Sequence, residues 1–216
     1  MINHFKNYCL FLLLLFPLGV IFAQSNVSER YALINAFEEI DEHVRDCPKE
    51  IKSDPDQLVE YLDEVVETDL EKARALYVWL ADNISYNAKA LNKNKYGDNS
   101  AEGVLKSKKA VCAGYANLFE LLGKKMELDI LTVGGYSKNA NDEKEWYFVD
   151  EEADHAWNVI RIDGEWKVFD ATWAAGIAYD DKKGRMVFKK QYTDNWFNLS
   201  PYEAIFTHYP EDTSLM

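Results

Sequence analysis

The chain has 216 residues, of which 48% are hydrophobic and 14% aromatic, and its formal net charge is −13. A composition this rich in apolar and aromatic residues excludes a disordered chain. The excess of acidic residues excludes nucleic acid as a partner, because phosphate binding needs clustered lysine and arginine. We therefore expect a folded protein whose acidic surface is well hydrated.

Residues 1–23 have the layout of a secretory signal peptide. Lys6 provides a positive charge, residues 10–22 form a short apolar run, and Ala23 supplies a small residue for cleavage. The run is too short to span a membrane comfortably, so we expect no stable span after cleavage. An uncleaved N-terminal anchor is the alternative. The expected product is exported to the periplasm or the extracellular space, with residues 24–216 as a single domain.

Cys47 and Cys112 are the two cysteines that would remain after cleavage. Two cysteines are too few for a disulfide scaffold, and neither CxxC nor histidine-rich spacing indicates zinc. We therefore expect no metal and no cofactor. A disulfide between Cys47 and Cys112 is the alternative to a free thiol at Cys112, and it would favour a protein without catalytic activity.

The first half of the chain is expected to be helical. Apolar residues recur at helical spacing between Ser28 and Val44, Asp54-Pro55 has the form of a helix start, and Thr68 with Glu71 forms a capping box. Residues 87–99 have no apolar period and predict an exposed loop. The expected helices cover 28–45, begin again near 54 and 68, include a short one at 100–106, and resume near Cys112.

The second half of the chain is expected to form strands. Residues 130–136 predict a strand in which Gly134-Gly135 marks a bulge or a turn. Residues 156–162 and 165–169 flank Asp163-Gly164, a strong signal for a hairpin. The remaining expectations are a possible strand at 146–149, a polar insert at 176–188 and an ordered segment at 191–210. Helices followed by an antiparallel sheet define an α+β fold.

Cys112 lies where a helix is expected to begin. A thiol attacks as its thiolate, and the positive end of a helix dipole favours that anion. The unpaired amide groups of the first helical turn can also hydrogen-bond an oxyanion that forms on an attacked carbonyl. Cys112 is therefore a candidate nucleophile, and a buried structural cysteine is the alternative.

His155 and Asp170 are the candidate partners of this cysteine. If Asp163-Gly164 is a two-residue loop, the register of the hairpin places Asp170 opposite Trp157. His155 is two residues from Trp157 on the same strand, so these side chains share one face. A carboxylate there can hold the imidazole in the orientation that a triad needs. A histidine at a sheet surface and a capping aspartate are the alternatives.

Three segments carry a likeness to a known family: Val-Cys-Ala-Gly-Tyr-Ala at 111–116, Asp-His-Ala-Trp-Asn at 154–158 and Phe-Asp-Ala-Thr-Trp at 169–173. In this order and spacing they resemble the transglutaminase-like superfamily, especially its microbial and kyphoscoliosis-peptidase-like members. Residues 74–86 resemble the helix that precedes the core of those proteins, and residues 198–210 resemble the segment that follows it. The resemblance covers about residues 68–210.

This resemblance implies a papain-like α+β fold with a catalytic triad. Cys112 would be the nucleophile, His155 the general base and acid, and Asp170 the carboxylate that orients the imidazole. It also implies acyl transfer through a thioester, with water or an amine as acceptor. Animal transglutaminases use an upstream tryptophan at the oxyanion site, but Trp79 is expected on a helix, so the second oxyanion donor stays open. Nothing resembles a calcium site.

The sequence therefore favours an exported cysteine hydrolase, a peptidase or amidase that acts on a protein or peptide. A protein-crosslinking transglutaminase is one alternative. A catalytically inactive transglutaminase-like module that binds a partner is another. The substrate, the oligomeric state and the redox state of Cys47 are left open by the sequence.

Overall fold

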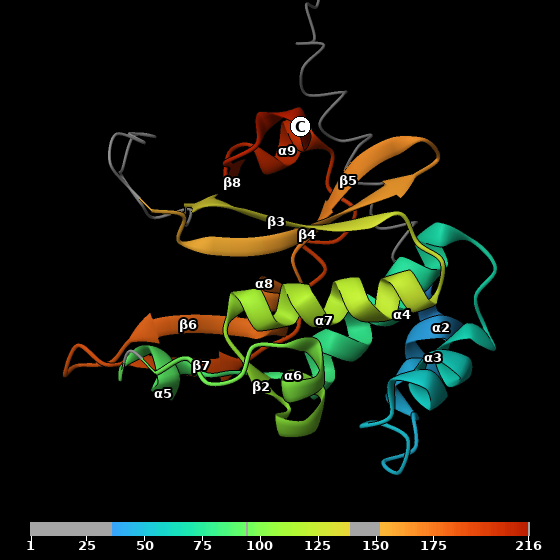
Figure 1. Ribbon diagram of the computed structural model, residues 1–216, viewed down its shortest axis with the longest axis horizontal. Coiled ribbons are helices and arrows are strands. Elements are labelled where there is room, and N and C mark those ends of the chain that lie inside the picture. Colours follow the sequence, from blue (N-terminus) through green and yellow to red (C-terminus); the bar gives the residue numbers. More distant parts are fainter. Residues whose placement is uncertain (1–35, 94, 139–151, 216) are drawn as a thin grey trace, which may run out of the picture. The chain divides into compact units, whose positions relative to one another are not determined.

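The helical half of the fold largely follows the sequence pattern. A computed structural model describes residues 36–93, 95–138 and 152–215 (Figure 1). By its contacts the chain divides into residues 1–36 and residues 37–216, and every element below belongs to the second unit. Its helices are α2 (Glu38–Arg45), α3 (Pro55–Asp63), α4 (Asp69–Asn83), α5 (Ala88–Leu91), α6 (Ala101–Ser107), α7 (Cys112–Lys125), α8 (Ala171–Ala175), α9 (Pro201–Ala204) and the 3₁₀ turn η1 (Thr213–Leu215).

The helix starts at Asp54 and Thr68 are confirmed, and side chains define both. The Asp54 carboxylate accepts hydrogen bonds from the first-turn amides of α3, where Pro55 needs no partner. Thr68 and Glu71 form the reciprocal capping box of α4. Both starts are local, because each depends on residues within one helical turn.

Three expectations for the helical half need adjustment. The helix expected over 28–45 covers 38–45, because residues 36–37 form a turn, and the part before residue 36 lies outside the described residues. The expected loop at 87–99 contains the short helix α5, whose N-cap Asn87 accepts from the Ala90 amide. The expected signal peptide at 1–23 and the strand expected at 146–149 also lie outside the described residues.

The strands of the described residues are β1 (Ser85–Tyr86), β2 (Lys109–Ala110), β3 (Ile130–Ser137), β4 (His155–Ile162), β5 (Glu165–Phe169), β6 (Gly176–Asp180), β7 (Met186–Lys190) and β8 (His208–Pro210). They form one four-stranded antiparallel sheet and two small pairs. The main sheet has the order β5-β4-β3-β8, while β1 pairs with β2 in parallel and β6 pairs with β7. The hairpin at Asp163-Gly164 is confirmed as a two-residue loop, since Ile162 pairs with Glu165.

Two expectations for the strand region are wrong. Gly134-Gly135 forms neither a bulge nor a turn, because β3 runs through both residues and stays in register with β4. Gly135 is instead required by a close approach: a Cβ there would lie 2.3 Å from the Tyr209 carbonyl oxygen. The expected polar insert at 176–188 is largely the β6–β7 hairpin. Its strands mix polar and apolar residues, so polarity alone does not identify them as strands.

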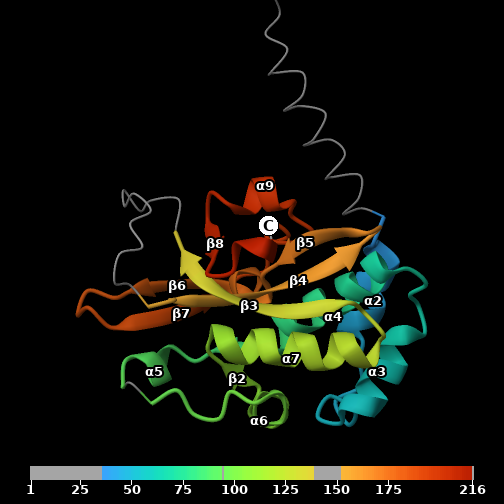
Figure 2. The same cartoon turned by 45° about the horizontal axis from the view of Figure 1, so that its top comes forward.

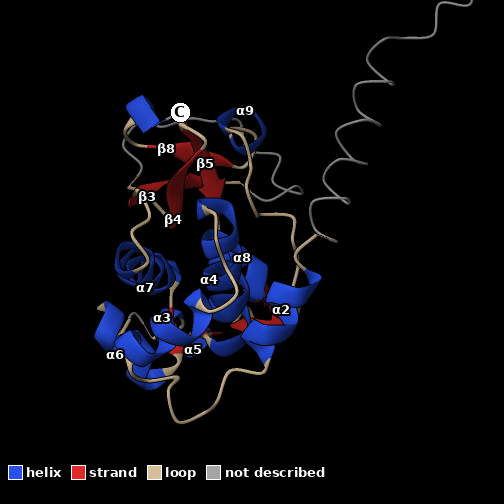
Figure 3. Ribbon diagram, turned by 90° about the vertical axis from the view of Figure 1, so that its right-hand side faces the viewer, coloured by secondary structure: helices blue, strands red, loops and turns tan. Residues whose placement is uncertain are grey.

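The two faces of the main sheet are covered by different elements (Figures 1 and 2). Helix α7 packs along β3 and β4, and the Asn158 side-chain amide donates to the Ala116 carbonyl of that helix at 3.1 Å. The opposite face carries a buried cluster that includes Trp157 and Val159, and Ala204 of α9 covers it. Figure 3 shows the sheet with α9 on one side and α4, α7 and α8 on the other. The α+β fold class is therefore as expected.

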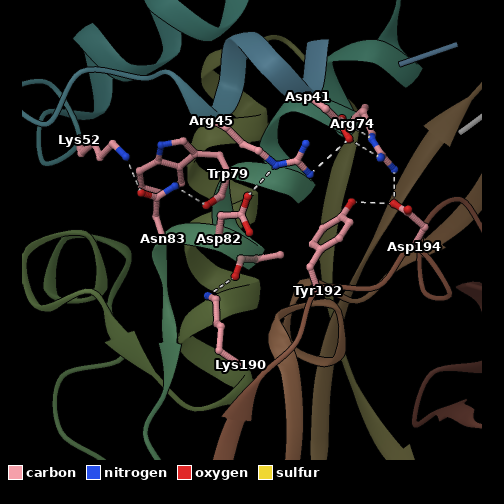
Figure 4. Close-up of polar contacts among 11 residues, drawn as sticks. Asp41, Arg45, Lys52, Arg74, Trp79, Asp82, Asn83, Lys190, Tyr192 and Asp194 are labelled. Carbon is pink, nitrogen blue, oxygen red and sulfur yellow. Dashed lines mark hydrogen bonds and ion pairs between the residues drawn. The ribbon is translucent and has the colours of Figure 1, made fainter. Parts of the chain in front are cut away.

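Helix α4 is largely buried and connects distant parts of the chain (Figure 4). The Arg74 guanidinium, 1% exposed, donates two hydrogen bonds to Asp41 at 2.7 and 2.8 Å and a third to Asp194. At the other end of α4, Lys190 from the hairpin donates to the Ile84 carbonyl at 2.8 Å. Polar contacts thus attach both the C-terminal segment and the hairpin to α4.

None of the helices in the described parts of the chain is long and apolar enough to cross a membrane.

Candidate active site

Cys112 is the first residue of α7, as the sequence predicts. Val111 is the N-cap in an extended conformation, and its side chain does not cap the helix. The amides of Gly114 and Tyr115 donate to the Val111 carbonyl, so the amides of Cys112 and Ala113 are those of the first turn that can donate to an oxyanion. Cys112 is partly exposed and Cys47 is buried, and both thiols are free. The Cys47–Cys112 disulfide is therefore not formed.

His155 and Asp170 form a buried hydrogen-bonded pair. The His155 Nε2 atom lies 2.7 Å from Asp170 Oδ2, and both side chains are at most 6% exposed. A carboxylate can only accept, so Nε2 carries the proton and donates it to Asp170. The other ring nitrogen, Nδ1, is then the one left for an interaction with Cys112, which also raises the pKa of His155. The sequence expectation that Asp170 is a neighbour of His155 is correct.

Asp170 is also the N-cap of α8, so this residue is both a helix cap and the partner of His155. Its Oδ1 atom accepts from the amides of Thr172 and Trp173 at 2.8 and 3.0 Å, while Oδ2 faces the histidine. The helix start therefore fixes the carboxylate plane that orients His155. Asp170 follows the last pair of the β4–β5 ladder, Asn158 with Phe169. Its position comes from the cap as well as from the hairpin.

His208 is a second histidine at the same carboxylate, and the sequence pattern did not identify it as a site residue. Its Nε2 atom lies 3.2 Å from Asp170 Oδ2, and its Nδ1 atom lies 2.9 Å from the Thr207 hydroxyl. Since Nε2 donates to the carboxylate, a neutral His208 must accept from Thr207 at Nδ1. The only sequence signal was its place in the segment after the core. Strand β8 brings it beside β3 and so to Asp170.

The charges in this cluster shift the titration of its members. Burial lowers the pKa of His155, but the charge and hydrogen bond of Asp170, followed by those of Cys112, raise it to about 10. Burial raises the pKa of Asp170, yet the charges and hydrogen bonds of the two histidines hold it well below its ordinary value. Burial lowers the pKa of His208, so this histidine is neutral. The result is an imidazolium at His155 held against the Asp170 carboxylate.

Aromatic rings enclose the two histidines. The Trp173 ring stacks on His155 at a centroid distance of 5.2 Å, and the Trp157 ring packs edge-on to His208 at 5.0 Å. Trp196 contacts Trp173 at 4.7 Å. These rings exclude water from the pair of His155 and Asp170, which strengthens its electrostatic interaction.

His155, Asp170 and His208 also have a spacing that could suit a metal ion. Ligand atoms of His155, Asp170 and His208 lie within 4.8 Å of one another, a spacing that an ion could use. However, Asp170 Oδ2 lies within hydrogen-bonding distance of both Nε2 atoms, so each of these nitrogens carries a proton and offers no lone pair to a metal. The residues fit a hydrogen-bond network better than a metal centre.

A cavity of about 450 Å³ opens beside His155. Cys112 is not among its lining residues, but Tyr86 is, and strand pairing places Tyr86 beside Ala110, two residues before the cysteine. Burial raises the pKa of Tyr86, and the charge of Cys112 raises it further. A substrate in this cavity would lie against His155 and beside the short strand that leads into Cys112.

Comparison with known proteins identifies the family. The family model described as "Transglutaminase-like superfamily" matches residues 56–171, a range that contains the three candidate residues. The chain belongs to the transglutaminase-like superfamily.

The chain is similar to several larger relatives. It is 32% identical over 161 residues to the kyphoscoliosis peptidase of Homo sapiens, covering 74% of this chain and 24% of that protein. It is 26% identical over 194 residues to the Lim and transglutaminase domain protein ltd-1 of Caenorhabditis elegans, covering 85% and 26%. A solved structure described as a TGase is 20% identical and covers 79% of this chain and 42% of that one, with a TM-score of 0.42. The chain thus spans about a quarter of the length of these curated relatives.

Proposed function

We propose that this protein is an exported cysteine hydrolase, a peptidase or amidase, that works by acyl transfer through Cys112, His155 and Asp170. The observation that carries the proposal is the buried 2.7 Å contact between His155 Nε2 and Asp170 Oδ2. It fixes the proton on Nε2, so Nδ1 is the nitrogen that would exchange a proton with Cys112. The name of the human relative, a peptidase, supports hydrolysis. Export rests on the signal-like residues 1–23 alone.

The reaction begins with the thiolate of Cys112 and the imidazolium of His155. The thiolate attacks the carbonyl carbon of an amide, and the oxygen becomes an oxyanion that the first-turn amides of α7 can stabilise. His155 then gives its Nδ1 proton to the leaving amine as the C–N bond breaks, which leaves an acyl-enzyme. Asp170 stays ionised throughout and holds the imidazole in place.

The second half of the cycle transfers the acyl group to water. His155 now accepts a proton from a water molecule, whose oxygen attacks the thioester carbonyl. The C–S bond breaks, the acid leaves, and the thiolate–imidazolium pair forms again. An amine in place of the water would give transamidation, so the acceptor decides between a hydrolase and a transglutaminase.

The test is a reaction of the purified protein with a mixture of unfolded proteins in ¹⁸O-labelled water containing a biotinylated primary amine. Hydrolysis places ¹⁸O at new C-termini, which mass spectrometry detects. Transamidation instead places biotin on glutamine side chains. Cys112→Ala is the control for both products. If neither product depends on Cys112, the chain is an inactive binding module and the proposal is wrong.

A further inference from the structure

We propose that the cavity beside His155 is a specificity pocket for a large uncharged side chain, aliphatic or aromatic, next to the reacting bond of a peptide substrate. This inference rests on the proposed function, because it assigns a substrate class to the same site. The inference goes beyond the proposed function, because the reaction itself requires no particular side chain. The volume of the cavity, about 450 Å³, lies within the range of roughly 300–1,000 Å³ that small-molecule sites occupy.

The lining of the cavity is mixed: its large side chains are mostly apolar, and polar side chains, among them Thr172, Gln191 and Asn195, lie between them. Its large side chains are aromatic or aliphatic and come from β1, α8, the hairpin and the segment before α9. They are Tyr86, Trp173, Ile177, Met186, Phe188 and Trp196. Such a lining gains free energy when an apolar group displaces water from it. Aromatic rings and methionine also adapt to side chains of different shapes.

The charge around the cavity disfavours acidic groups. Among the described residues that line it, Asp154 is the only carboxylate, and none is lysine or arginine. Asp154 is exposed, and its carboxylate accepts from the Ser137 amide at 2.7 Å, which holds the charge next to His155. The imidazolium of His155 also lines the cavity, but its side chain is 6% exposed and its Nε2 is bonded to Asp170. An acidic substrate side chain would therefore find no exposed cation there and would be repelled by Asp154. The pocket therefore selects by size and against negative charge.

The β6–β7 hairpin forms one wall of the pocket, and it is fixed at two places. Lys190 ties the end of β7 to the C-terminus of α4, and Asn92 pairs with both backbone groups of Met186 at 2.8 and 2.9 Å. At the base of β6, a Cβ on Gly176 would lie 2.2 Å from the Lys189 carbonyl oxygen, so the strands approach closely there. Phe188 of the hairpin contacts the Tyr86 ring at 5.9 Å. The hairpin is thus held against Tyr86 and the C-terminal end of α4.

The experiment uses small electrophiles that carry one amino acid side chain. The probes are phenylalanine, leucine and aspartate whose amino groups each carry an iodoacetyl group, and iodoacetamide is the reference. The rate of Cys112 alkylation is read by mass spectrometry and divided by the rate of each probe with glutathione. The expected result is that the leucine and phenylalanine probes react about tenfold or more faster than the aspartate probe.

Ile177 and Tyr179 give a matched pair of variants on one strand. Both are 51% exposed, but only Ile177 lines the cavity. Ile177→Lys should slow the leucine probe several-fold and speed up the aspartate probe, because a cation now faces the pocket. Tyr179→Lys adds the same charge and should change either rate by less than about twofold.

The outcomes separate this inference from the proposed function. If iodoacetamide reacts fast at pH 6 but the side chains make no difference, the pocket is wrong and the cysteine site stands. A side-chain preference that Ile177→Lys and Tyr179→Lys alter equally would also overturn the pocket. If iodoacetamide itself reacts as with an ordinary thiol, the proposed function fails, and the pocket loses its basis with it.

Discussion

Replacing Asp170 by asparagine tests the central interaction of the site. Asparagine is as good an N-cap as aspartate, so α8 should keep its start, whereas alanine would remove the cap together with the charge. With its oxygen on the helix amides, the new side chain turns an NH₂ group toward His155 Nε2. The imidazole must then carry its proton on Nδ1, where it cannot accept one from Cys112.

The size of the effect follows from the contact. Two unit charges about 4 Å apart at an effective dielectric constant of about 20 attract by about 4 kcal/mol. The rise in the pKa of His155 from 6.5 to about 10 corresponds to about 5 kcal/mol, to which Cys112 also contributes. Loss of about 4 kcal/mol would lower the population of the thiolate–imidazolium pair about a thousandfold. An ordinary thiol, with a pKa of about 8.5, is still about 0.3% ionised at pH 6, so the observable decrease is limited to about 300-fold.

The assay is the rate of Cys112 alkylation by iodoacetamide, followed by mass spectrometry between pH 5 and pH 10. We expect Asp170→Asn to react about 100-fold or more slowly than the wild type at pH 6 and at a similar rate at pH 10. Asp154→Asn removes an exposed carboxylate beside His155 and should change the rate by less than about threefold. Wild-type reactivity of a folded Asp170→Asn protein at pH 6 would refute the role of Asp170.

Three further predictions concern stability, measured as the free energy of unfolding in urea. Gly135→Ala should lower the free energy of unfolding by about 2 kcal/mol or more, because the added Cβ would clash with the backbone of β8. Gly134→Ala, whose added Cβ would lie 3.4 Å from its nearest neighbour, should lower it by less than about 1 kcal/mol. Equal losses would contradict this packing. Arg74→Met should cost about 3–5 kcal/mol, because the buried Asp41 loses both guanidinium hydrogen bonds and Asp194 loses its ion pair. The exposed Arg45→Met, which removes the longer ion pairs to Asp41 and Asp82, should cost less than about 1 kcal/mol, and a small loss at Arg74 would show that its partners are solvated. The pKa of His155 is raised in the folded state, so the stabilisation that protonated His155 provides is complete below about pH 6.5 and is lost as the pH rises to about 10. The difference in unfolding free energy between wild type and His155→Gln should therefore shrink over that window. A difference that grows with pH would show that the pKa is lowered instead.

The hairpin shows how far local pattern alone can reach. Asp163-Gly164 permits the positive backbone angles of a tight turn, which are 51° and 84° here, and that turn sets the register of β4 and β5. From this register the sequence already placed Asp170 near His155. The helix starts at Asp54 and Thr68 were equally predictable, since a cap and its amides lie within one turn.

Gly135 and His208 show what such patterns cannot give. A glycine in a strand looks like a bulge in sequence, but here it is required because β8, more than 70 residues later in the chain, crosses close to it. His208 reaches Asp170 through the same pairing of β8 with β3. The β6–β7 hairpin likewise depends on contacts with Asn92 and the end of α4, which no pattern within residues 176–190 contains.

The sequence by itself determined the family, the helix caps, the register of one hairpin and the identity of Cys112, His155 and Asp170 as candidates. These features depend on interactions over a few residues, or on motifs whose order along the chain is informative. Only the tertiary structure decided that Asp170 accepts from a second histidine and that a hairpin forms one wall of the pocket. These contacts join segments separated by tens of residues, and they form because burial of apolar surface brings whole elements together, a free energy that no short stretch of sequence expresses.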